Sequence, residues 1–212
     1  MEKLHRAIAF ALRRHEGQTR RDGVTPYAVH PLRVAFTLVL RAGVDDEATL
    51  CAALLHDVIE DTRTDHDEVR ERFGDEIADL VSALSKDRRL PERARETAYA
   101  AQVMAAGPKA HVAKLADLHD NLGDAIGFPP AERVASAKKK RALVLALCDA
   151  VAPELRGFAE EVKARLAAAL GARVSPGGAR GGARSAPPRA RRGPRPRARG
   201  ASPRGRRRGG RA

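Results

Sequence analysis

The sequence predicts an all-α fold, a compact helical bundle followed by a disordered C-terminal tail. Apolar residues recur every three or four positions up to Gly171, and no segment shows the strict alternation of a half-buried strand. Aromatic residues make up only 3% of the chain, so the core must consist of Leu, Val, Ile and Ala. After residue 171 the composition changes to Gly, Ala, Arg, Pro and Ser, which cannot bury enough apolar surface to become ordered.

The first helix is predicted from four apolar residues at helical spacing, namely Leu4, Ala7, Ile8 and Ala11. A loop over 17–27, rich in Gly, Pro and Arg, separates it from a second helix at 30–41. Gly43 supplies the residue type that commonly ends a helix.

The third helix, expected over 47–61, can be capped by Asp45 or Asp46. Thr64 is the predicted cap of a short fourth helix, and the apolar stripe that follows is broken near Gly74. That stripe consists of Val69, Phe73, Ile77, Leu80, Val81 and Leu84. The remaining helices are expected at 92–106, 109–125, 130–150 and 154–170.

The net charge of +13 is carried by the end of the chain. Residues 172–212 hold 14 of the 40 Lys and Arg residues and no Asp or Glu, which leaves 26 basic against 27 acidic residues in 1–171. The basic composition therefore does not indicate that the folded part binds nucleic acid. The tail could bind the phosphates of RNA or DNA, or it could be a nonfunctional extension or a translation artefact of GC-rich DNA. Its lack of Lys and of aromatic residues favours the last two interpretations.

Cys51 and Cys148 lie far apart in apolar segments, and the chain has no CxxC pair. We expect buried free thiols in a reducing cytosol rather than a thiolate zinc site. The N-terminus lacks the apolar core of a signal peptide, and no apolar run approaches the roughly 18 residues of a membrane helix. The expected location is therefore cytoplasmic, with no membrane partner.

The segment 54–62 carries the most information about function. One imidazole and three carboxylates stand close together in an otherwise apolar helical run, from His56, Asp57, Glu60 and Asp61. Like charges at these spacings repel one another and are costly to desolvate together. A solvated acidic face would explain an isolated pattern of this kind, but the apolar flanks favour a bound divalent cation.

Further short motifs occur in order along the chain: Ala9-Phe10-Ala11, His15-Glu16-Gly17-Gln18, Pro26-Tyr27, His30-Pro31, Phe73-Gly74, Lys114-Leu115-Ala116-Asp117 and Asn121. Together with 54–62 they resemble the HD hydrolase domain of the RelA/SpoT family in order and spacing. The resemblance covers roughly residues 4–153. It implies that residues 1–171 form an HD-type, metal-dependent phosphohydrolase domain.

The resemblance implies a metal site with the ligands His30, His56, Asp57 and Asp117. Two neutral imidazoles and two carboxylates form a mixed nitrogen and oxygen site that suits Mn²⁺ or a similar cation and leaves positions for water and substrate. His56 and Asp57 are adjacent on one predicted helix, so their side chains leave it in different directions and must bend toward a common metal ion. The other two ligands must arrive from other helices.

The resemblance also implies a catalytic pair, Glu60 and Asp61, one turn beyond Asp57. These two carboxylates are expected to orient and deprotonate the attacking water, while the metal lowers the pKa of that water.

A substrate with several phosphates requires cationic side chains, and Arg20 and Arg21 lie in the loop before the first metal histidine. Arginine suits phosphate because its planar guanidinium donates two parallel hydrogen bonds. Asn121 matches a family position that faces the nucleotide. Lys114 and Arg95 are weaker candidates for substrate binding.

One segment departs from the family pattern. Between Asp117 and Asn121 the chain has Leu118-His119-Asp120, which lacks the basic residue that the family typically has after the aspartate. We interpret the dipeptide His119-Asp120 as a decoy, because no matching carboxylate pair follows it. The other histidines, His5, His15, His66 and His111, are expected to be ordinary core or surface residues.

The predicted function is Mn²⁺-dependent hydrolysis of the 3′-pyrophosphate of guanosine tetra- or pentaphosphate (ppGpp or pppGpp), giving GDP or GTP and pyrophosphate. The altered segment 118–120 motivates an alternative, an HD phosphohydrolase acting on another nucleotide, such as a 3′-phosphorylated dinucleotide or a nucleoside monophosphate. A hypothesis of another class is a nucleic-acid-associated protein that acts through the arginine-rich tail. The oligomeric state is left open.

Overall fold

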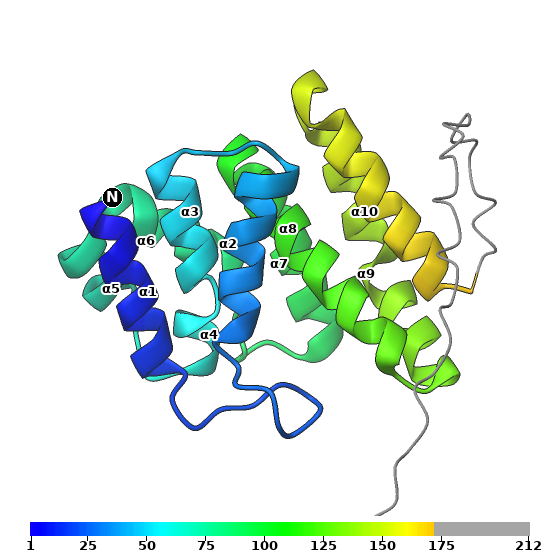
Figure 1. Ribbon diagram of the computed structural model, residues 1–212, viewed down its shortest axis with the longest axis horizontal. Coiled ribbons are helices and arrows are strands. Elements are labelled where there is room, and N and C mark those ends of the chain that lie inside the picture. Colours follow the sequence, from blue (N-terminus) through cyan, green and yellow to red (C-terminus); the bar gives the residue numbers. More distant parts are fainter. Residues whose placement is uncertain (172–212) are drawn as a thin grey trace, which may run out of the picture. The chain divides into compact units, whose positions relative to one another are not determined.

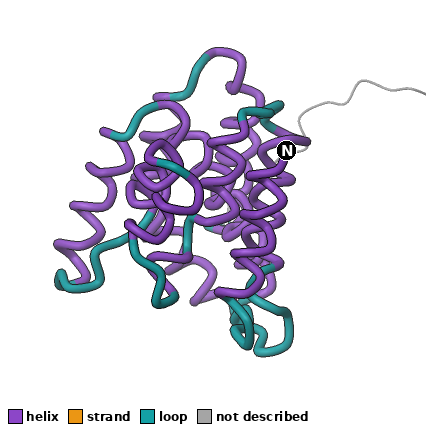
Figure 2. The backbone as a smooth tube through the Cα atoms, turned by 90° about the vertical axis from the view of Figure 1, so that its left-hand side faces the viewer, coloured by secondary structure: helices purple, strands orange, loops and turns teal. Residues whose placement is uncertain are grey.

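The computed structural model describes residues 1–171, and every regular element in this range is a helix (Figures 1 and 2). The elements are α1 (Glu2–Arg14), α2 (Val29–Arg41), α3 (Glu47–Leu55), α4 (Val58–Asp61), α5 (His66–Phe73), α6 (Asp75–Leu84), α7 (Glu92–Ala105), α8 (Pro108–Asp124), α9 (Pro130–Ala150) and α10 (Arg156–Ala169), with short 3₁₀ turns at Ala125–Gly127 and Pro153–Leu155. The all-α prediction is confirmed. The predicted disordered tail, 172–212, lies outside the described residues.

The third predicted helix is wrong in one respect, because the structure divides it in two. Helix α3 ends at Leu55 and α4 begins at Val58, so His56 and Asp57 form a turn between them. The imidazole Nδ1 of His56 folds back to 2.7 Å from the carbonyl oxygen of Ala53. Asp57 leaves the ideal helical conformation, with φ of −100° and ψ of −5°. The interruption therefore coincides with the two residues that carry the chemistry.

Two helices begin at aspartate caps. Asp46, one of the two candidates, accepts a hydrogen bond from the Thr49 backbone N–H at 2.8 Å at the start of α3. The predicted cap of the fourth helix is wrong by one residue. Asp65 caps α5 by accepting from the Glu68 backbone N–H at 2.8 Å, whereas Thr64 is buried. A carboxylate accepts from N–H groups more strongly than a neutral hydroxyl does, which explains the choice.

Two apolar clusters form the interior of the described part. One joins α1, α3, α5 and α6, and the other joins α2 with α7 to α10, while α3 and α8 contribute to both. Helix α2 packs on both α3 and α8, and α3 also packs on α8. The beginning of α2, the end of α3 and the middle of α8 are thereby held together at the junction of the two clusters.

Both cysteines are buried and free, as predicted. Burial raises the pKa of the Cys51 thiol and that of the Cys148 thiol to about 11, so neither is a thiolate at neutral pH. In the range 1–171, no helix has both the length and the apolar composition needed to cross a bilayer.

Candidate metal centre and active-site cavity

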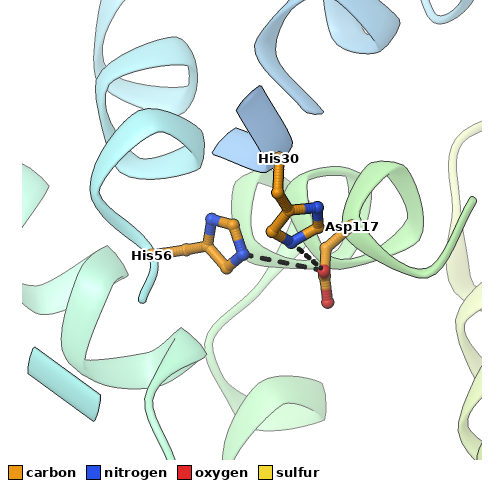
Figure 3. Close-up of side chains that lie close together, drawn as sticks. All are labelled: His30, His56 and Asp117. Atoms are coloured by element: carbon orange, nitrogen blue, oxygen red, sulfur yellow. Dashed lines mark ion pairs between the residues drawn. The ribbon is translucent and has the colours of Figure 1, made fainter. Parts of the chain in front are cut away.

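Side chains from two helices and from the turn that follows a third converge at one point (Figure 3). His30 is the second residue of α2, His56 directly follows α3, and Asp117 lies within α8. The Oδ1 atom of Asp117 lies 3.0 Å from His30 Nε2 and 3.6 Å from His56 Nε2. All three residues are buried, and their candidate ligand atoms lie within 4.8 Å of one another.

Asp57, the fourth predicted ligand, reaches the same point from the turn after α3. Its Oδ2 atom lies 3.0 Å from His56 Nε2 and 3.7 Å from His30 Nε2. Ligand atoms about 2.0–2.2 Å from a metal ion stand roughly 3.0–3.6 Å apart in neighbouring coordination positions. The structure therefore brings His30, His56 and Asp117 together as one possible cation site, and Asp57 approaches the two histidines of this site.

The hydrogen bonding of His56 also fits a metal. Its Nδ1 contacts a backbone carbonyl, which accepts a hydrogen bond, while its buried Nε2 makes no well-directed hydrogen bond within residues 1–171, although Asp57 Oδ2 lies 3.0 Å away. Leaving a buried polar nitrogen without a partner is costly, and coordination would remove that cost. Burial lowers the pKa of His56, but Asp57 and Asp117 outweigh burial and raise it well above its usual value in the metal-free protein. A proton and a metal ion therefore compete for this nitrogen.

Two of the predicted substrate-binding residues hold the ligand Asp117. Lys114, one turn earlier on α8, donates from Nζ to Asp117 Oδ2 at 2.7 Å. Asn121, one turn later, donates from Nδ2 to Asp117 Oδ1 at 2.5 Å. These contacts fix the orientation of the carboxylate. Both residues also line the cavity in front of it, so their role toward substrate stays a prediction.

Glu60 is the less constrained member of the predicted catalytic pair. Its Oε2 accepts a hydrogen bond from the backbone N–H of Lys86 at 3.0 Å, and its side chain lines the same cavity as the metal ligands. Burial raises the pKa of Glu60, and the charges of Asp57 and Asp61 add to this effect. A carboxylate with a raised pKa is better suited to accept a proton near neutral pH.

The carboxylate of Asp61 contacts two side chains. It forms an ion pair with Arg88, and its Oδ2 lies 3.1 Å from the hydroxyl of Tyr27. The same hydroxyl donates to Oδ2 of Asp57 at 2.6 Å. Burial raises the pKa of Tyr27 and the two carboxylates raise it further, so the hydroxyl remains a donor. Tyr27 belongs to the Pro26-Tyr27 motif, but the sequence did not indicate this role.

Two cavities meet at this site. The first has a volume of about 630 Å³ and is lined by the candidate metal ligands His30, Asp57 and Asp117 together with the catalytic candidates. The second has a volume of about 750 Å³ and is lined by Arg20, Arg21 and Arg33. Both are lined by Tyr27, Asn121 and Lys140. A ligand with a long chain of phosphates could therefore contact the metal ligands and the arginines at once.

The three arginines predicted to bind substrate differ in exposure, in partners and in whether they line a cavity. Arg20 is mostly buried and donates to Asp124 Oδ2 at 2.8 Å and to Asn121 Oδ1 at 3.2 Å. Arg21 is more exposed and pairs with Glu132. Arg95 lies on α7, half-buried, and lines neither of the two cavities.

The dipeptide His119-Asp120, interpreted as a decoy, contributes no residue to the candidate metal cluster of the described residues. Nε2 of His119 lies 3.1 Å from Oε1 of Glu161 in α10. Asp120, in contrast, lies 2.6 Å from Nδ1 of His30, and Arg33 contacts the same carboxylate. Sequence reasoning did not predict the contact of Asp120 with His30 or that with Arg33, because no motif links these residues. The only signal was that a carboxylate replaces the family pattern at this position.

Known proteins are similar to this chain in sequence. The model of the HD domain family matches residues 7–120. The human guanosine-3′,5′-bis(diphosphate) 3′-pyrophosphohydrolase MESH1 is 42% identical over 123 residues, which are 58% of this chain and 69% of that protein. The guanosine-3′,5′-bis(diphosphate) 3′-pyrophosphohydrolase of Aquifex aeolicus is 37% identical over 141 residues, 65% of this chain but only 20% of that protein.

A solved structure shares the fold. It is described as a metazoan orthologue of SpoT that hydrolyses ppGpp, and it covers 78% of this chain and 96% of its own length with a TM-score of 0.69 and 29% identity. The family match spans more than half of the chain and includes all four candidate metal ligands. The chain therefore belongs to the HD domain family and is a homologue of the guanosine-3′,5′-bis(diphosphate) 3′-pyrophosphohydrolases.

Proposed function

We propose that this protein hydrolyses the 3′-pyrophosphate of ppGpp or pppGpp with the help of Mn²⁺, and releases pyrophosphate and GDP or GTP. One observation carries the proposal. His30, His56 and Asp117 lie together as a possible cation site, and His30, Asp57, Asp117 and Glu60 line one cavity, in a chain whose curated relatives bear the name of this activity. The cytoplasmic location stays a prediction.

In this reaction Glu60 and Asp61 have different roles. Glu60 accepts a proton from the attacking water, whose oxygen bonds to the phosphorus attached to the 3′-oxygen. The bond between that phosphorus and the 3′-oxygen breaks, and the 3′-oxygen takes up a proton to become a hydroxyl. Asp61 is held by Tyr27 and Arg88, and its carboxylate orients the attacking water. When bound, the metal supplies positive charge that lowers the pKa of water and stabilises the negative phosphates.

The remaining phosphates require donors, and the second cavity offers Arg20 and Arg21. Arg20 is already oriented by Asp124 and Asn121, which reduces the entropy lost when it binds a phosphate. Lys140 lines both cavities, so it can interact with a substrate that spans them. Burial lowers the pKa of Lys140 below its usual value.

One observation favours the alternative, another phosphorylated nucleotide as substrate. The side chain next to the metal ligand Asp117 that lines the cavity is the apolar Leu118. The positive charge that the family pattern has at this position is missing, which reduces the attraction for a highly charged nucleotide.

The test compares purified protein with the His56→Ala variant in MnCl₂. The substrates are ppGpp, a 3′-phosphorylated dinucleotide and a nucleoside monophosphate, and released pyrophosphate and phosphate are measured separately. Pyrophosphate release from ppGpp that is lost in His56→Ala supports the proposal. No release from ppGpp by the intact protein would refute it, and efficient phosphate release from another substrate would support the alternative.

A further inference from the structure

The two histidines at the metal centre are held from behind by different groups. In both, Nε2 points toward the convergence point of the ligands, and Nδ1 makes a contact on the opposite side. For His56 this contact is the neutral backbone carbonyl of Ala53, at 2.7 Å. For His30 it is the carboxylate of Asp120, at 2.6 Å. His30 and Asp120 are 1% and 8% exposed, so water competes little for this hydrogen bond.

Asp120 is itself fixed. Arg33 contacts it twice, from Nε to Oδ1 at 2.7 Å and from Nη2 to Oδ2 at 2.9 Å. The hydrogen bond from Nη2 restrains the carboxylate, and the positive charge of Arg33 neutralises a charge that would otherwise be expensive to bury. Asp120 and the ligand Asp117 lie one turn apart on α8, while His30 and Arg33 lie one turn apart on α2. The contact therefore depends on how α2 and α8 pack.

A histidine that binds a metal through Nε2 must carry its proton on Nδ1. A carboxylate that accepts this proton fixes the tautomer and the ring orientation, and it increases the electron donation of Nε2 to the metal. A backbone carbonyl fixes the tautomer as well but carries no charge. The centre therefore has one histidine of ordinary donor strength and one that is strengthened.

We propose that Asp120 is a positioning residue that holds His30 in the metal-binding tautomer and strengthens it as a ligand, with Arg33 as the clamp that keeps the carboxylate in place. This inference rests on the metal site of the proposed function. It concerns the affinity for the metal alone, so it can be tested without any nucleotide.

The experiment is isothermal titration of metal-free protein with MnCl₂. Asp120→Asn keeps the shape of the side chain but removes its charge, and we expect the dissociation constant for Mn²⁺ to rise about 10- to 100-fold. Asp124→Asn is the matched control, because Asp124 pairs with the same Arg33 without a contact to His30 among the hydrogen bonds of the described residues. We expect its affinity to stay within about threefold of the unmodified protein, since partly exposed ion pairs contribute little.

Equal Mn²⁺ affinity of Asp120→Asn and the unmodified protein would overturn the inference while leaving the proposed function intact. Absence of Mn²⁺ binding by the unmodified protein would overturn both. If Asp120→Asn does not fold, the inference is tested instead by locating the proton on the imidazole of His30. In the unmodified protein loaded with Zn²⁺, nitrogen NMR must show a proton on Nδ1 of His30 with the strongly downfield shift of a short hydrogen bond to a carboxylate. An Nδ1 without a proton would overturn the inference.

Discussion

Lys114 and Asp117 form a buried ion pair across one turn of α8, with Lys114 Nζ 2.7 Å from Asp117 Oδ2. The other oxygen of Asp117 faces the two metal histidines. One carboxylate therefore joins a permanent cation of the protein to the position of the proposed metal ion. Because the lysine balances part of the buried negative charge, it also stabilises the site when no metal is bound.

The first prediction concerns this pair. Lys114→Met should lower the free energy of unfolding of the metal-free protein by about 3 kcal/mol, because it leaves Asp117 buried without its cation. Added MnCl₂ should recover part of the loss, since the metal supplies the missing positive charge. Urea unfolding with and without MnCl₂ measures both effects. The control Lys109→Met removes an exposed lysine that pairs with Asp46 and Glu76 and should change the stability by less than about 1 kcal/mol.

The second prediction concerns the proton acceptor. Glu60→Gln should lower kcat about 10²- to 10⁴-fold, because the amide cannot accept a proton from water. Binding of Mn²⁺ should be nearly unchanged, since Glu60 is not one of the four proposed ligands. Steady-state kinetics together with titration calorimetry separates the two quantities. Glu71→Gln, on the exposed face of α5, serves as the control and should keep full activity. If Glu60→Gln kept the kcat of the unmodified protein, a group other than Glu60 would have to accept the proton from water.

The third prediction is a pH dependence of metal binding. Burial lowers the pKa of His30 and of His56, but the neighbouring aspartates outweigh burial and raise both above the ordinary value in the metal-free protein. Below these raised values the imidazoles hold protons that the metal must displace, so the affinity for Mn²⁺ should rise with pH until both are neutral. The expected slope is about tenfold per pH unit for each proton displaced. Calorimetry in buffers of different ionisation enthalpy counts the released protons, and an affinity independent of pH would contradict the prediction.

The fourth prediction concerns the start of α3, the helix that ends at the metal centre. Asp46→Ala should destabilise the protein by about 1 kcal/mol, because the first turn of α3 loses its cap. Asp45→Ala, at the exposed neighbouring position, should have almost no effect. Thermal unfolding of Asp46→Ala and Asp45→Ala measures both changes in stability.

The contribution of Asp46 should also depend on pH. Burial raises the pKa of Asp46, but the hydrogen bonds from Thr49 and Lys109 outweigh burial and leave it below the usual value of 3.8. The stabilisation is therefore fully present above the pKa of the unfolded chain, and it is lost as the pH falls through the lower pKa of the folded state. The difference in stability between the unmodified protein and Asp46→Ala should shrink in this acidic range. A constant difference would show that the cap acts without its charge.

Local patterns in the sequence were sufficient for much of the fold. Helical periodicity and helix-ending residues predicted the order of the helices, since these signals depend on neighbours three or four residues apart. The break at His56 and Asp57 was missed because their apolar flanks continue the helical pattern on both sides. The imidazole contact to Ala53 that accompanies the break involves an orientation that periodicity does not encode.

The sequence by itself determined the helical class and the buried cysteines, because these follow from residue type and spacing, and its resemblance to a known family suggested the four residues proposed to bind the metal. Only the tertiary structure decided what surrounds those residues. Asp120 and His30 are separated by 90 positions, and their contact exists because α2 packs against α8. The same packing turns Lys114 toward a metal ligand and brings Arg33 onto Asp120. Helix packing sets such distances, and they are specified by the shapes of many core side chains together rather than by any short motif.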